Sequence, residues 1–187
     1  FTWEKDASTF YNYRASGSSL FYSLNGTGSW TLAANGTIGA GRAVGHAVLG
    51  TTLVICDGVG STRHTTSGTS FTDSTLAPIL IDVEQYQNRI YGAGTASDAF
   101  FSTTNDPTNW NTSGTSDSSS LTIPGGGRLG KLIKVSDKLH FTKTNQEMYR
   151  WDGYSLVDMA TNLGPSSIQS VAKTEDFAHW LNRLGHF

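Results

Sequence analysis

The feature that most constrains the fold is an imperfect internal repeat of short strand-forming runs. Residues 88–111, NRIYGAGTASDAFFSTTNDPTNWN, contain two such runs joined by a turn and followed by an Asp-Pro turn and a tryptophan. An upstream stretch, FYSLNGTGSWT, aligns with FFSTTNDPTNWN, which places Ser23 over Ser102 and Trp30 over Trp110. Three fainter copies bring the total to five.

Equivalent anchor residues recur about 40 to 50 residues apart, which is the period of a β-propeller blade. The first run of each copy has its anchor at Phe10, Leu53, Ile90, Leu139 and Phe177. The second run follows about 10 to 12 residues later, with anchors at Tyr22, His64, Phe101, Tyr149 and Phe187. One twisted four-stranded sheet cannot bury both of its faces alone, so blades stack around an axis and cover one another.

The sequence therefore predicts an all-β fold, a β-propeller of four-stranded antiparallel blades, and a partial propeller or a fragment of a larger one. Residues 1–187 form a single propeller region in this interpretation. Its expected divisions are an incomplete blade at 1–38, blades at 39–76, 77–124 and 125–162, and an incomplete blade at 163–187. The alternative for residues 174–183 is a helix, because four apolar residues fall at helical spacing: Phe177, Trp180, Leu181 and Leu184. The repeat favours strands there.

Composition agrees with many short strands, since the 187 residues include 21 glycines and 4 prolines. The 13 basic and 15 acidic side chains nearly balance, and no basic run supports nucleic-acid binding. Six basic residues between 128 and 150 are interpreted as a solvated blade surface. No run approaches the roughly 20 apolar residues of a membrane span. No cofactor or metal site is predicted, and Cys56 is expected to be a buried hydrophobe.

Ser23, Asn25 and Trp30 resemble part of the Asp-box hairpin of sialidase-type propellers, although the glycines fall at other places. Ser102, Asp106 and Trp110 form a longer second copy. The expected role is structural, because the short polar side chain caps a tight turn and the tryptophan packs between blades. A sialidase-like hydrolase would need an arginine cluster, a tyrosine nucleophile and acidic partners. The arginines Arg42, Arg89, Arg128 and Arg183 do not occupy equivalent repeat positions, so no catalytic residue is predicted.

Residues 80–187 also resemble the propeller regions of virion proteins from the tail, nozzle and neck of tailed bacteriophages. The shared features are an S…DP.NW turn, a K-L…F-T strand, a W-D-G turn and an N-R-x-G turn. They correspond here to Ser102, Asp106, Pro107, Asn109 and Trp110; Lys138, Leu139, Phe141 and Thr142; Trp151, Asp152 and Gly153; and Asn182, Arg183 and Gly185.

The resemblance implies a non-enzymatic assembly module located in a virion, oligomeric and partnered by neighbouring virion or scaffold subunits. Two alternatives stay open. One is a carbohydrate-binding or glycosidase-like propeller, with a glycan as ligand. The other is a generic propeller interaction scaffold.

Overall fold

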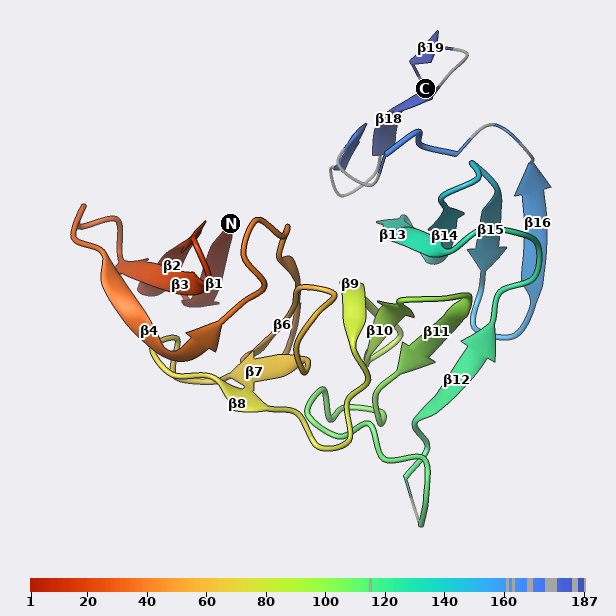
Figure 1. The fold of residues 1–187 in the computed structure, drawn as a ribbon. Helices are drawn as coiled ribbons and strands as arrows, with labels where there is room; N and C mark the ends of the chain where they lie inside the picture. Colours follow the sequence, from red (N-terminus) through yellow and green to blue (C-terminus); the bar gives the residue numbers. More distant parts are fainter. Residues whose placement is uncertain are drawn as a thin grey trace.

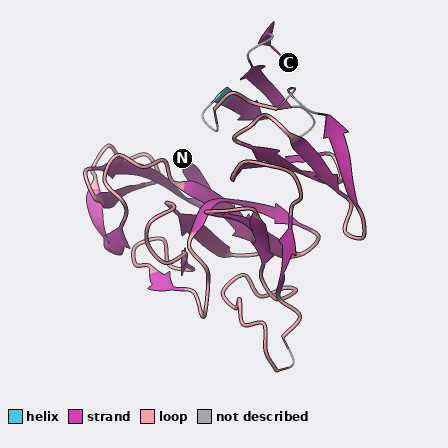
Figure 2. Cartoon of the chain, turned by 45° about the vertical axis from the view of Figure 1, so that its right-hand side comes forward, coloured by secondary structure: helices cyan, strands magenta, loops and turns pink. Residues whose placement is uncertain are grey.

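A computed structural model describes residues 1–114, 116–160, 162, 164–167, 170–173, 178–182 and 185–186. Nearly all regular structure in these residues is β-strand, as Figure 2 shows. Within the same ranges, no helix is long and apolar enough to cross a membrane.

Five antiparallel sheets follow one another along the chain, and consecutive strands pair as neighbours in each. The first sheet contains β1 (Thr2–Asp6), β2 (Thr9–Ser16), β3 (Ser19–Leu24) and β4 (Thr31–Thr37). The second contains β5 (Gly45–Leu49), β6 (Thr52–Cys56), β7 (Arg63–Thr65) and β8 (Thr72–Asp73).

The third and fourth sheets repeat this meander of four strands. The third contains β9 (Leu80–Tyr86), β10 (Arg89–Gly94), β11 (Asp98–Phe101) and β12 (Ser119–Thr122). The fourth contains β13 (Leu129–Val135), β14 (Lys138–Lys143), β15 (Met148–Trp151) and β16 (Leu156–Ala160). The described part of the fifth contains β17 (Val171–Lys173), β18 (Ala178–Asn182) and β19 (Gly185–His186).

The sheets stand side by side around an arc, with β1, β9 and β13 toward its centre and β4, β8, β12 and β16 along its outside (Figure 1). The inner strands β5, β9 and β13 contact one another in turn. Parallel backbone bridges from Ala34 to Ser70 and from Thr75 to Asn109 tie neighbouring sheets together. This is the blade arrangement of a β-propeller, which the described residues form as an arc.

The core consists of three apolar layers, one between each adjacent pair of the first four sheets. In β6 the side chains alternate, so that Leu53 and Ile55 pack toward the first sheet and Val54 and Cys56 toward the third. A strand covered on both faces needs a continuous apolar run, which explains the sequence LVIC. Each such side chain contributes roughly 1.5–3 kcal/mol by its burial.

The first sheet differs from the incomplete blade expected for residues 1–38, because β1 and β4 complete it to four strands. Trp3 is the one buried residue of β1, and β4 buries Ala33 and Gly36. Strands with so few buried positions lack an apolar run and are hard to recognise from sequence.

The structure corrects one predicted anchor residue, that of the second run in the fourth sheet. Val54 pairs with His64 and Tyr91 with Phe101, whereas the pairing of β14 joins His140 to Arg150. The expected anchor, Tyr149, therefore lies one residue out of register. Its ring packs into the layer toward the third sheet.

The strand interpretation of the C-terminal stretch is confirmed for Ala178–Asn182, which form β18. Residues 174–177 and 183, which completed the helical alternative, lie outside the described residues, as do the anchors Phe177 and Phe187.

Candidate functional site

The residues predicted in the first Asp-box-like copy lie around the connection between β3 and β4. Asn25 has a positive φ of 48°, its Oδ1 accepts a hydrogen bond from Phe10 N at 2.9 Å, and it fastens this turn to β2. Ser23 is buried in β3. Trp30 is 37% exposed and lies 4.4 Å from the Arg14 guanidinium carbon, measured to the ring centroid. In the described chain Trp30 thus stacks on an arginine at the surface and does not fill a layer between sheets.

The second copy is built more deeply into the fold. Ser102 Oγ accepts a hydrogen bond from Ile90 N at 3.1 Å, which links β10 to the end of β11. Asp106 Oδ1 accepts from Thr108 N at 3.0 Å and forms a local turn. Trp110 is 4% exposed and belongs to the apolar layer between the second and third sheets.

The predicted W-D-G residues form the turn between β15 and β16. Asp152 Oδ1 accepts hydrogen bonds from Ser155 N at 2.8 Å and Tyr154 N at 2.9 Å, and these bonds lower the pKa of Asp152 to about 2. Gly153 has a φ of 100°, which favours glycine. Trp151 packs at the edge of the layer between the third and fourth sheets. The three groups of predicted residues therefore lie in separate turns and do not converge on one cavity.

A buried carboxylate joins the third sheet to the fourth. Asp82 is 3% exposed; its Oδ1 lies 2.7 Å from Lys131 Nζ, and its Oδ2 accepts from Leu132 N at 2.8 Å. The sequence analysis placed Lys131 among the basic residues of a solvated blade surface. The available signal was the position of Asp82 inside the apolar run LIDV, where an unpaired charge would be costly.

Lys143 corrects the expectation that the basic residues of 128–150 form a solvated surface. It is 1% exposed, and its Nζ donates hydrogen bonds to the carbonyl oxygens of Ile123 at 3.1 Å, Pro124 at 2.6 Å and Gly125 at 3.1 Å. Burial lowers the pKa of Lys143, and the nearby Glu147 opposes that shift. The ammonium holds the connection from the third to the fourth sheet.

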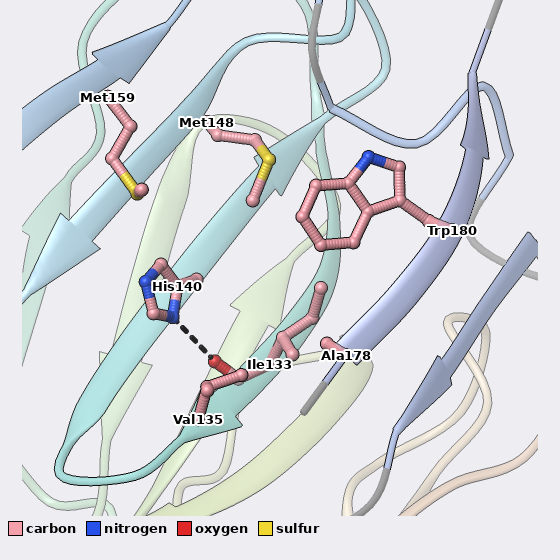
Figure 3. A pocket seen from close by; sticks show the side chains of 7 residues that line it. All are labelled: Ile133, Val135, His140, Met148, Met159, Ala178 and Trp180. Atoms are coloured by element: carbon pink, nitrogen blue, oxygen red, sulfur yellow. Dashed lines mark hydrogen bonds between the residues drawn. The ribbon is translucent and has the colours of Figure 1, made fainter. Parts of the chain in front are cut away.

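An apolar cavity of about 240 Å³ lies between the fourth sheet and the β17–β19 sheet (Figure 3). Met148, Met159 and His140 face Trp180 of β18 across it. Met159 is 48% exposed, so the cavity opens to solvent beside it. Thioether side chains are flexible and adapt to ligands of different shape.

Among the described residues that line this cavity, His140 is the one with a titratable side chain. Its Nδ1 lies 3.3 Å from the carbonyl oxygen of Ile133. Burial lowers the pKa of His140 below its usual 6.5; the hydrogen bond to Ile133 O opposes this shift, and the positive charge of Arg150 adds to it, so the neutral imidazole predominates at pH 7. The described residues that line the cavity include no carboxylate, and glycoside hydrolysis requires a pair of carboxylates in most families.

Fold and cavity together define a class: a partial β-propeller with an apolar cavity between its last two sheets. No family model matches the chain, and the comparison with curated proteins finds no match.

Solved structures with a similar fold include two of BBS1N in complex with ARL6DN. The crystal soaked with lead gives a TM-score of 0.58 at 13% identity and covers 98% of this chain and 60% of that one. The crystal soaked with mercury gives 0.52 at 12% identity, covering 97% and 65%. The chain thus spans less than two thirds of the length of these neighbours. The likeness supports the propeller fold, and the narrower resemblance to virion proteins stays a prediction.

Proposed function

We propose that this chain is a non-enzymatic β-propeller scaffold that binds another protein, and that the apolar cavity receives a side chain of that partner. The observation that carries the proposal is the lining, in which two methionines and a tryptophan surround a neutral histidine. Such side chains are suited to holding an apolar anchor. Acid–base or nucleophilic catalysis would need a reactive pair in reach of one another.

The size of the cavity supports a single anchoring side chain. Its volume of about 240 Å³ falls below the ~300–1,000 Å³ typical of small-molecule sites. Binding energy at protein interfaces concentrates in a few side chains that fill such pockets. The structural neighbour BBS1N, solved in complex with ARL6DN, supports a binding role by analogy of fold alone.

The test begins with a photoreactive amino acid at position 159, which identifies the partner by crosslinking in the source cells. The affinity of that purified partner is then measured by biolayer interferometry for the wild type, Met159→Glu and Leu76→Glu. Leu76 is a matched control because it is 70% exposed and lies between β8 and β9, away from the cavity. We expect Met159→Glu to weaken binding at least about tenfold, the loss of one good anchor contact. Equal affinities of the two folded variants would contradict the proposal.

The resemblance of residues 80–187 to bacteriophage proteins supports a narrower form of the same role. In that form the partners are neighbouring virion subunits, the chain is oligomeric and its location is the virion. Quantitative mass spectrometry of purified virions should then find the chain in fixed stoichiometry with other tail or neck proteins. Its absence from virions would remove the narrower form and leave the scaffold proposal standing.

A further inference from the structure

One face of the first sheet lies open at the end of the arc (Figure 1). Tyr11 and Tyr13 of β2 pack into the layer toward the second sheet. Side chains alternate along a strand, so the residues between and beside them point to the opposite face. Among the described residues, no other sheet packs on that face. We call this surface the free face; it is formed by Phe10, Arg14, Phe21, Trp30 and Leu32.

The free face has the composition of a contact surface. Leu32 is 57% exposed and Trp30 is 37% exposed. Cross-strand pairing places Arg14 beside Phe21, and Phe21 beside Leu32. The guanidinium carbon of Arg14 lies 4.4 Å from the centroid of the Trp30 ring and 5.7 Å from that of Phe21. Aromatic residues and arginine contribute most of the binding energy at protein interfaces, so this cluster indicates a site of protein contact.

The repeat gives the position of Arg14 a structural meaning. In the first, second and fourth sheets, the hairpin of the two inner strands closes with the pairs Asp6–Thr9, Leu49–Thr52 and Val135–Lys138. The residue five positions after each closing pair is charged: Arg14, Asp57 and Lys143. These residues occupy equivalent positions, on the side of the strand that looks toward the preceding sheet. The apolar residues two and four positions earlier show this side, since they pack against the first sheet for Asp57 and against the third for Lys143.

Asp57 and Lys143 each bind the connection that arrives from the preceding sheet. Asp57 accepts a hydrogen bond from Gly39 N at 2.6 Å, in the connection between β4 and β5. Lys143 Nζ donates to Pro124 O at 2.6 Å, in the connection between β12 and β13. The third sheet has Gly94 at this position, where an added Cβ would lie 2.6 Å from a backbone oxygen. A charged side chain at this position therefore ties one sheet to the sheet before it.

Arg14 has the same position but is exposed. Among the described residues it forms no ion pair, because no carboxylate oxygen lies within 4.0 Å of its guanidinium nitrogens. Arg89, by contrast, pairs with Asp117 at 2.6 Å. A guanidinium group has five N–H donors and no acceptor, so the group that completes it must supply oxygen atoms. For Lys143 these are backbone carbonyl oxygens.

We propose that the free face binds a β-sheet of a partner protein, which stacks on it as a further blade, and that Arg14 donates hydrogen bonds to backbone carbonyl oxygens of that sheet. The occupant is a sheet because the three contacts of this kind within the first four sheets each join two sheets through an apolar layer. Its facing side is apolar and covers Phe21 and Leu32. Its carbonyl oxygens belong to the connection that leaves its outer strand, as in the contact of Lys143.

This inference is independent of the apolar cavity, which lies between the fourth sheet and the β17–β19 sheet. Failure of either proposal therefore leaves the other standing.

The first experiment identifies what covers the free face. A photoreactive amino acid replaces Leu32, and the full chain is crosslinked in its source cells. Mass spectrometry then gives the sequence of the crosslinked peptide. We expect this peptide to come from another polypeptide and from a strand of a β-sheet or the connection that follows it. A crosslink confined to the same polypeptide, or one to a helical segment of another protein, would overturn the proposal.

The second experiment tests the role of Arg14. Biolayer interferometry measures the affinity of the purified partner for the wild type, Arg14→Met and Arg14→Lys. Arg128→Met is the matched control, because Arg128 is exposed and lies in the connection between β12 and β13. We expect Arg14→Met to weaken binding at least about tenfold, because charge-assisted hydrogen bonds are lost.

Arg14→Lys should weaken binding less than Arg14→Met does, since Lys143 makes equivalent bonds in the fourth sheet. Arg128→Met should change the affinity less than about twofold, the scale of a distant screened charge. Because Arg14 is exposed, all variants should keep the urea midpoint of the wild type. Equal affinities of folded Arg14→Met and Arg128→Met would overturn the proposal.

Discussion

The buried ammonium of Lys143 provides the sharpest test of how the sheets are held together. Its Nζ donates three hydrogen bonds to the consecutive carbonyl oxygens of Ile123, Pro124 and Gly125. Lys143→Met keeps the length of the side chain and removes the donor. A hydrogen bond with a charged partner contributes about 1.5–3 kcal/mol, and a buried carbonyl left unpaired costs about 1–3 kcal/mol.

The three bonds share one donor and do not add independently, and the cost of burying the ammonium, visible in its lowered pKa, is recovered on substitution. We therefore expect a net loss of about 3 kcal/mol in the free energy of unfolding. For a chain of this length that corresponds to a melting temperature lower by about 6–12 °C.

Urea denaturation followed by tryptophan fluorescence measures this loss. Lys138→Met is the matched control, because the Lys138 side chain is 37% exposed and its Nζ lies 3.6 Å from the exposed Asp137. A surface pair of this kind contributes about 0–1 kcal/mol. If Lys143→Met unfolds at the same urea concentration as Lys138→Met, the three hydrogen bonds of Lys143 do not stabilise the fold and the reasoning is refuted.

Three further predictions concern the other contacts between sheets and turns. Asp82→Ala should lower the free energy of unfolding by about 3–5 kcal/mol, because it leaves the partly buried Lys131 and the N–H of Leu132 without their partner. An unchanged denaturation midpoint would contradict this. Trp110→Ala should lower the free energy of unfolding by about 3–5 kcal/mol, and Trp30→Ala by less than about 1 kcal/mol. Equal losses of stability in parallel thermal melts would contradict this difference in packing. The pKa of Asp152 is lowered from 3.8 to about 2, so its stabilising contribution is complete above pH 3.8 and is lost as the pH falls through about 2. Asp152→Asn should therefore flatten that part of the acid unfolding curve. An acid unfolding curve identical to that of the wild type would refute the assignment.

Much of the architecture can be predicted from the sequence because the same pattern of strands is repeated in each blade. The expected anchors Leu53, Ile90 and Leu139 fall on β6, β10 and β14. Among these strands, β6 is covered on both faces, so its apolar residues form an unbroken run. The outer strands were harder to place because they have one covered face and few buried side chains, as in β4.

The polar contacts between sheets could not be predicted in the same way. Asp82 and Lys131 are 49 residues apart, and Lys143 binds carbonyl groups about 20 residues earlier in the chain. Spacing along the sequence carries no information on such pairs, because the stacking of the blades decides which residues meet. Asn25, Asp106 and Asp152 accept hydrogen bonds from the backbone of their own turn or of an adjacent strand. A local sequence pattern is enough to predict such turn residues.

The apolar cavity lies where the chain departs from its own repeat. On the face that looks toward the following sheet, the paired positions of β10 and β11 hold Tyr91 and Phe101, which fill an apolar layer. The same positions in the fourth sheet hold His140 and Arg150. His140 does not fill this space as an aromatic pair does, and it lines the cavity that stays open against β18. The repeat therefore specifies the fold, and its interruption in the fourth sheet leaves the cavity that we propose as the binding site.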